Sequence, residues 1–106
     1  AAMDLSQPVL DRSMFHAEGA YYLEHVDIRG SVCFTNIAPA TAFRGFGGPQ
    51  AVAVIENALQ EVAIFLREES STRLSAADIQ RRNLYGCGER NVTPYGQVFH
   101  GTTLTK

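Results

Sequence analysis

A segment without helix breakers, from Gln50 to about Glu69, follows directly on Gly-Gly-Pro. Because proline is favoured at the first helical position, the sequence predicts a long helix that begins at Pro49. Its polar side comprises Glu56, Asn57, Gln60, Glu61, Arg67 and Glu68. The opposite, apolar side comprises Val52, Ile55, Leu59, Val62 and Leu66. Ile64 falls on the polar side, which fits either one exposed isoleucine or cover by another part of a larger protein.

A second helix is indicated near the N-terminus. Ser6 precedes Gln-Pro, which is N-cap chemistry with proline in the first turn. Apolar residues then recur at helical spacing at Leu10, Met14 and Ala17. We therefore expect a helix from about Gln7 to Ala17. Arg12 lies well off this apolar stripe, so the pattern alone indicates a solvated arginine.

A third helix has the clearest start signal. Ser75 is followed three residues later by Asp78, which predicts a reciprocal capping box. Leu74 and Ile79 flank this cap at the spacing of a hydrophobic staple. The helix should end near Gly86.

Two segments have β-strand character. From Val26 to Thr35 the hydrophobic period changes to two, which predicts a half-buried strand. Gly30 interrupts its centre and indicates a bulge, a bend or the close approach of another backbone. Gln97–His100, between two glycines, is a weaker strand candidate. The expected fold is therefore α+β, in the order helix, strand, glycine loop, long helix, helix and short strand.

Composition limits the function classes. With 106 residues, 45% hydrophobic and 19% charged, the chain has the make-up of one globular domain covering residues 1–106. Its net charge of −2 leaves no basic stripe for nucleic acid. It has no apolar run of membrane-spanning length and no signal-peptide pattern at its start, so we expect a cytoplasmic protein and no membrane partner. Its two cysteines and three histidines are scattered, so a protein-ligated metal is not indicated.

The loop "TAFRGFGGPQ" from Thr41 to Gln50 carries the strongest functional signal. A glycine loop that enters a helix directs N–H groups and the positive helix end toward an anion. The sequence lacks Gly-Lys-Ser/Thr and G-x-G-x-x-G, so it is neither a P-loop nor a dinucleotide fingerprint. Arg44 suits an oxyanion, while Phe43 and Phe46 suit a flat conjugated ring. The alternative is that both rings fill a core and the glycines only make a tight turn.

The same loop resembles the molybdenum-binding subunit of xanthine dehydrogenases, where its ten residues recur almost letter for letter. The segments "DLSQPVLDRSMFH", "AYYL", "RGSVCFTN" and "RRNLYG" resemble that family in the same order. The similarity is looser after Gly88. Family members are several times longer, so we expect an internal fragment of their molybdopterin-binding domain.

The resemblance implies roles for particular residues. It places the backbone of Ala42, Phe43 and Arg44 near the molybdenum cofactor, with Arg44 nearest the metal. It implies that Phe46 packs on a purine ring. It also implies that Arg12, in "DRSMFH", polarises a purine oxygen and stabilises the negative charge that develops on the ring. This reading is opposite to the solvated arginine that the helical pattern indicates.

The implied reaction is the hydroxylation of hypoxanthine and xanthine to urate at a Mo-molybdopterin cofactor. The family's base glutamate, in a downstream G-x-G-E segment, and a second substrate-binding glutamate are absent, so we expect the isolated chain to be inactive. The family's 2Fe-2S clusters and FAD belong to other segments. Expected partners are the purine, the remaining segments of the parent enzyme and, for the isolated chain, further copies of itself. Alternatives are an aldehyde oxidase-like hydroxylase or a non-catalytic interaction module.

Overall fold

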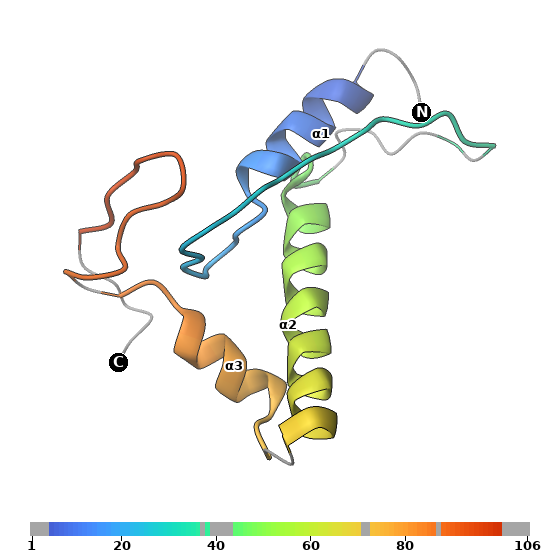
Figure 1. The fold of residues 1–106 in the computed structure, drawn as a ribbon. Coiled ribbons are helices and arrows are strands. Elements are labelled where there is room, and N and C mark those ends of the chain that lie inside the picture. The colour runs from blue at the N-terminus through green and yellow to red at the C-terminus, as the bar shows by residue number, and fades with distance from the viewer. Residues whose placement is uncertain (1–4, 37, 39–43, 71–72, 87, 101–106) are drawn as a thin grey trace. The chain divides into compact units, whose positions relative to one another are not determined.

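The computed structural model describes residues 5–36, 38, 44–70, 73–86 and 88–100, with the side chain of residue 70 excepted. Its contacts divide the chain into two compact units. The first unit comprises Ala1–Gly19 and Asp27–Ile55, and the second comprises Ala20–Val26 and Glu56–Lys106. Three helices stand out in the described residues (Figure 1), namely α1 (Ser6–Phe15), α2 (Gly48–Ser70) and α3 (Ala76–Asn83).

Helix α1 forms close to the expected place but with different ends. Leu5, rather than Ser6, is the N-cap residue, and it makes no side-chain capping hydrogen bond. The predicted serine cap is therefore wrong. The helix ends at Phe15, two residues before the predicted Ala17. Val9 is its buried residue.

Helix α2 confirms the predicted long helix. It spans 23 residues and begins one residue before Pro49. Its buried apolar residues repeat every four positions and are Ala51, Ile55, Leu59 and Ala63. Val52 and Val62, which were expected on the buried side, are 47% and 44% exposed. The buried stripe is thus narrower than the apolar arc, and two of its four members are alanines.

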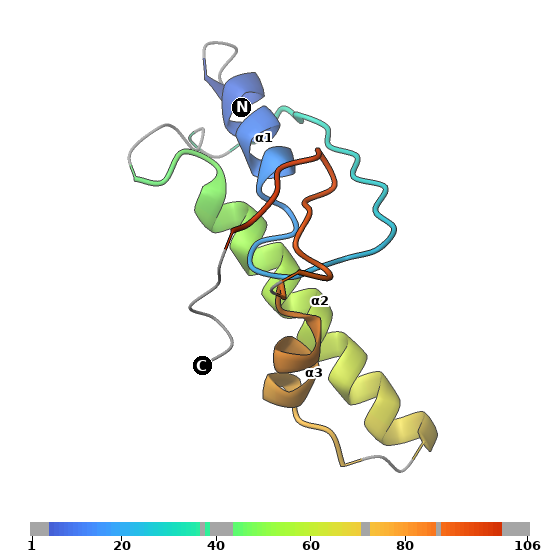
Figure 2. The same ribbon diagram turned by 90° about the vertical axis from the view of Figure 1, so that its left-hand side faces the viewer.

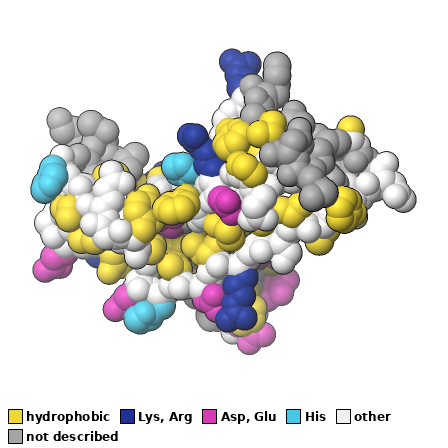
Figure 3. Space-filling model, turned by 90° about the horizontal axis from the view of Figure 1, so that it is seen from above, with side chains coloured by type: hydrophobic (Ala, Val, Ile, Leu, Met, Phe, Trp, Pro, Cys, Tyr) yellow, Lys and Arg dark blue, Asp and Glu magenta, His cyan; other side chains and the backbone are white. Residues whose placement is uncertain are grey.

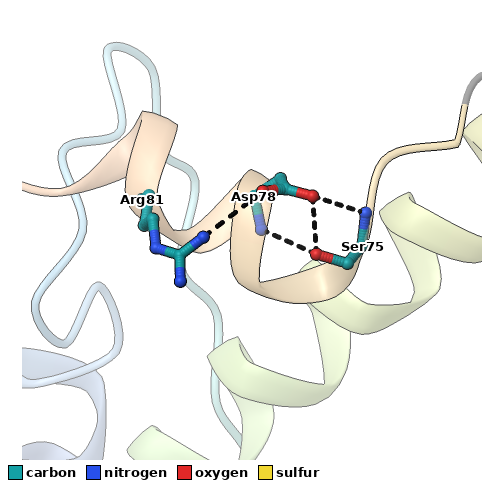
Figure 4. Close-up of polar contacts among 3 residues, drawn as sticks. All are labelled: Ser75, Asp78 and Arg81. Atoms are coloured by element: carbon teal, nitrogen blue, oxygen red, sulfur yellow. Dashed lines mark hydrogen bonds and ion pairs between the residues drawn. The ribbon is translucent and has the colours of Figure 1, made fainter.

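Helix α3 confirms the predicted capping box (Figure 4). The Asp78 backbone N–H donates to Ser75 Oγ at 3.2 Å, while the Ser75 backbone N–H donates to Asp78 Oδ2 at 2.9 Å. The Ser75 hydroxyl and backbone bonds to the carboxylate lower the pKa of Asp78. The helix ends at Asn83, earlier than the predicted end near Gly86, because Leu84 turns to an extended conformation.

The strand expected over Val26–Thr35 is not formed. This segment has no regular secondary structure in the described chain, and its apolar side chains are exposed. A strand needs a neighbour for its backbone hydrogen bonds, and no strand ladder is assigned beside it among the residues that the structure describes. The segment runs as an extended connection past α1 (Figure 1).

After α3 the chain of the second unit continues without a further helix in its described residues (Figure 2), and aromatic side chains form a core there. Tyr85 is 1% exposed and meets Tyr22 edge-on, with 6.0 Å between ring centroids. Its ring centroid lies 4.9 Å from that of Phe99. Two isolated antiparallel bridges, Tyr21 with Leu84 and Val92 with Val98, tie the chain here. The strand expected at Gln97–His100 is reduced to the second of these bridges.

Candidate functional site

The glycine loop is described from Arg44 onward. Arg44 is exposed and Phe46 is half-buried at the entrance to α2. The remaining two predicted loop residues, Ala42 and Phe43, lie outside the described residues. Both Arg44 and Phe46 belong to the first unit, as does Arg12 on α1.

The backbone at the end of this loop has an unusual conformation. Gly45, Phe46 and Gly47 have φ angles of +83°, +43° and +91° in succession. Glycine adopts positive φ readily, whereas a bulky aromatic residue there is an outlier. Such a conformation costs roughly 1–3 kcal/mol and persists only where surrounding structure imposes it, often at ligand sites. The strain at Phe46 therefore marks this residue as a functional candidate.

The neighbouring glycines show what holds the loop in this shape. A Cβ added to Gly45 would lie 2.5 Å from Pro49 Cγ, so the loop folds tightly onto the first turn of α2. A Cβ added to Gly47 would lie 2.3 Å from the Val9 carbonyl oxygen and 3.0 Å from the Ser13 backbone nitrogen. Gly47 thus lies directly against the backbone of α1.

Helix α1 also meets the extended segment on another side. A Cβ at Gly30 would lie 2.6 Å from Leu10 Cδ1 and 2.9 Å from Met14 Sδ. The close approach that the sequence indicated at Gly30 is therefore made to α1 side chains. Arg12 is exposed and lies in the turn of α1 that Gly47 touches. The first unit thus joins Phe46, through Gly47, to the helical turn that carries Arg12.

A separate polar cluster in the second unit was not found by sequence reasoning. The Tyr21 hydroxyl donates to Glu56 Oε1 at 2.6 Å, and Gln80 Nε2 donates to Glu56 Oε2 at 2.5 Å. Burial, together with the hydrogen bond to Glu56, raises the pKa of Tyr21 to about 12. The helical wheel assigned Glu56 to the solvent side, and no local pattern connects it with Tyr21, which lies 35 residues earlier. This cluster joins α2 to α3 and to Tyr21, which is itself a residue of the first bridge.

Comparison with known families identifies the chain's relationship. The family model described as "Molybdopterin cofactor-binding domain" matches residues 1–84. The chain belongs to this family. The match includes the loop, α1, α2 and α3, and therefore all five predicted site residues.

The matches to curated relatives extend over almost the whole chain. The chain is 43% identical over 101 residues to a xanthine dehydrogenase of Oryza sativa subsp. japonica, and 36% identical over 104 residues to a xanthine dehydrogenase/oxidase of Felis catus. It is 42% identical over 97 residues to a nicotinate hydroxylase of Emericella nidulans. These matches cover 95%, 98% and 92% of the chain but only 7% of each relative's length. No solved structure gives a significant match.

The described residues fit an anionic, planar cofactor and substrate. The exposed Arg44 guanidinium provides fork-like donors beside the N-terminus of α2, where the helix dipole also favours negative charge. Phe46, two residues later in the chain, is half-buried. In the described part of the chain, no group of three or more His, Cys, Asp or Glu side chains could hold a metal ion. Likewise, none of the described helices combines the length and apolarity needed to cross a membrane.

Proposed function

We propose that this chain is part of a xanthine dehydrogenase that hydroxylates hypoxanthine and xanthine. The observation that carries the proposal is the strained Phe46, held beside the helix of Arg12 in a molybdopterin cofactor-binding domain. Two relatives named as xanthine dehydrogenases or oxidases, together with the loop resemblance, support purines as the substrates. The chain supplies part of the site, and the base glutamate comes from elsewhere in the parent enzyme.

Phe46 orients the purine in this proposal. Its ring stacks on the flat heterocycle in an offset arrangement, which adds about 0.5–1.5 kcal/mol beyond the buried area. The positive φ of Phe46 directs the ring in a way that the ordinary helical or extended conformation would not. The strain is then offset by the substrate and cofactor contacts of the complete site.

Arg12 stabilises negative charge on the purine. Its guanidinium donates to a carbonyl oxygen of the purine on which charge builds up during hydroxylation, and a donor so placed contributes on the order of 3 kcal/mol. In the chain by itself Arg12 is exposed, so its charged head is available to a ligand.

The backbone of Ala42, Phe43 and Arg44 holds the molybdenum cofactor in this proposal. When bound, that cofactor supplies the oxygen-transfer and electron-accepting chemistry of the reaction. The 2Fe-2S clusters and FAD that pass electrons onward are held by other segments. The role of this chain's own residues is to bind, orient and stabilise charge.

The proposal also assigns partners to the exposed apolar side chains. Val54 and Phe65 of α2 are 67% and 61% exposed, and Phe34 of the extended segment is 84% exposed. Hydrophobic side chains reach the surface in several places on the face drawn in Figure 3. We assign these side chains to contacts with the remaining segments of the parent enzyme, because large apolar patches mark interfaces.

The test is Arg12→Met in the full-length enzyme, with Arg67→Met as the control. Arg67 is an exposed arginine in the last turn of α2, so it matches Arg12 in type and exposure. We expect Arg12→Met to lower kcat/KM for xanthine by about 10²–10³-fold, the loss typical of one preorganised donor. A simple aromatic aldehyde has no carbonyl oxygen on its ring, apart from the reacting aldehyde group, for the guanidinium to reach, so its turnover should be spared.

Molybdenum content is measured first, and rates are expressed per metal centre. Equal losses on xanthine and on the aldehyde, or none on either, would contradict the role of Arg12. A wild-type enzyme that prefers the aldehyde would favour the aldehyde oxidase-like alternative, and one that prefers nicotinate would favour the activity for which the Emericella nidulans relative is named. Full-length protein without molybdenum would favour the non-catalytic module.

A further inference from the structure

Two glycines lie against neighbouring faces of α1. Gly47 lies against Val9 and Ser13, and Gly30 lies against Leu10 and Met14. We call Gly30 and Gly47 the glycine clamp. At 100° per residue, the Val9–Ser13 side and the Leu10–Met14 side are neighbouring faces of the helix, and Arg12 belongs to neither. The clamp therefore contacts two faces of the helix and leaves the Arg12 side chain exposed.

The contact at Gly47 is made to backbone and cannot be relieved by a side-chain rotation. Val9 and Ser13 stand four residues apart, which is the spacing of a helical acceptor and its donor. Arg12 lies within that same turn. A Cβ at Gly47 would be 2.3 Å from the Val9 oxygen, against an ordinary contact distance of 3.4 Å or more. The loop or the helical turn would have to move by about 1 Å.

We infer that Gly47 is a positioning residue that sets Arg12 relative to Phe46. The inference rests on the proposed function, in which those two side chains act on one purine. Phe46 precedes Gly47 directly, and Gly47 abuts the turn of Arg12, so any displacement at this contact changes the separation of the two groups. Gly30 restrains the neighbouring face of the same helix.

This role has a distinctive kinetic signature. A misplacement of about 1 Å can cost roughly 10²-fold in rate. Gly47→Ala in the full-length enzyme should therefore lower kcat/KM for xanthine by about 10²-fold per molybdenum centre. An aromatic aldehyde, which does not use Arg12, should lose less than about 3-fold. A residue that only supported the fold would affect both substrates together.

The chain offers two matched control variants. Gly48→Ala changes the adjacent residue, where an added Cβ has nothing within 4 Å. Gly88→Ala reproduces the conformational strain, because Gly88 also has a φ of +91° but has nothing within 4 Å of an added Cβ. Neither control should reproduce the xanthine-selective loss. Gly88→Ala thereby separates the effect of positive φ from the effect of contact with α1.

The decisive experiment is a double-mutant cycle of Gly47→Ala with Arg12→Met. If Gly47 acts by positioning Arg12, the double variant should turn over xanthine about as slowly as Arg12→Met alone, because coupled residues are not additive. Amide hydrogen exchange gives a readout independent of activity. Exchange in α1 should become at least about 10-fold faster in Gly47→Ala, but not in Gly48→Ala or Gly88→Ala.

Each outcome has a distinct meaning. A further large loss from Gly47→Ala in the Arg12→Met background would overturn the inference and leave the proposed function standing. Equal losses on both substrates, or unchanged α1 exchange, would overturn it as well. An Arg12→Met enzyme with normal xanthine turnover would instead overturn the proposed role of Arg12.

Gly30→Ala provides the test if Gly47→Ala fails to assemble with molybdenum. The three atoms nearest its added Cβ belong to the side chains of Leu10 and Met14, so the expected displacement of α1 is smaller. We expect a xanthine-selective loss of roughly 10-fold. Shortening the obstructing side chain with Leu10→Ala should restore part of that loss. A non-selective loss in Gly30→Ala would overturn the inference.

Discussion

Tyr21→Phe removes one hydroxyl from the polar cluster of the second unit and should loosen α3. In the folded chain that hydroxyl donates to Glu56 Oε1 at 2.6 Å, and Tyr21 is only 6% exposed. A hydrogen bond to a charged group contributes about 1.5–3 kcal/mol. The substitution keeps the ring, so any loss of stability comes from removing the hydroxyl and from leaving Glu56 Oε1 without that donor.

The ionisation of Tyr21 fixes the pH at which this effect should be measured. Its pKa is raised from 10.0 to about 12, first by burial and then by Glu56. A raised pKa means that the folded state favours the neutral phenol. The stabilisation is therefore complete below pH 10 and is lost as the pH rises through about 12. Measurements at neutral pH should show the whole effect.

The assay is amide hydrogen exchange at neutral pH in the full-length enzyme. Because a tenfold change in local opening corresponds to about 1.4 kcal/mol, exchange in α3 should be roughly 10- to 100-fold faster in Tyr21→Phe. The α1 amides, in the first unit, serve as an internal reference. Exchange in α3 at the wild-type rate would refute the reasoning.

Tyr22→Phe is the matched control. Tyr22 is the next residue, and the contacts described for its side chain are made by its ring, with Tyr85 at 6.0 Å and with Arg90 at 5.1 Å. Loss of its hydroxyl should change α3 exchange by less than about 3-fold. If both tyrosine variants accelerated exchange equally, the bond to Glu56 would not be the cause.

The remaining predictions concern the cap of α3 and the exposed apolar side chains. Ser75→Ala should speed exchange in the first turn of α3, since loss of an N-cap serine costs about 1 kcal/mol; wild-type exchange would contradict the cap. Because the pKa of Asp78 is lowered from 3.8, the stabilisation that its carboxylate gives to α3 is complete above pH 3.8 and is lost as the pH falls through the lower folded pKa. Asp78→Asn should abolish this acid dependence of α3 exchange. The isolated 106-residue chain should self-associate through side chains such as Val54 and Phe65, and Val54→Glu/Phe65→Glu should reduce the effect. Light scattering that shows a monomer over a wide concentration range would contradict the predicted self-association.

Local signals in the sequence predicted the helices well. The capping box needs only Ser75, Asp78 and the backbone between them, so four consecutive residues contain the whole arrangement. The long helix follows from the absence of breakers over Gln50–Glu69 and from the proline at its start. Where the serine cap of α1 failed, the helix began one residue earlier and enclosed Ser6 in its first turn. Helix ends shift in this way because the free energy changes little when a helix begins at one residue rather than at its neighbour.

Features that depend on distant partners were not predictable from local pattern. Alternation over Val26–Thr35 describes side chains suited to a sheet, but it does not supply the neighbouring strand. The wheel of α2 could not show that Ala51 and Ala63 would be buried while Val52 and Val62 remained exposed. Small residues permit close approach of a neighbour, and that advantage appears only once the neighbour is in place. The same holds for Glu56, whose two donors come from other parts of the chain.

For the candidate site, the amino-acid sequence of the loop and its backbone geometry give different information. Resemblance selected Arg12, Ala42, Phe43, Arg44 and Phe46, and it implied that the backbone of the loop approaches the cofactor. The structure shows that the open side of Gly47 is occupied by α1. A loss of molybdenum or of turnover after substitution of Gly47 is therefore not by itself a sign of direct cofactor contact. The same glycine-rich segment can position the substrate indirectly, because it contacts the helix that carries Arg12. That arginine lies more than thirty residues earlier in the chain.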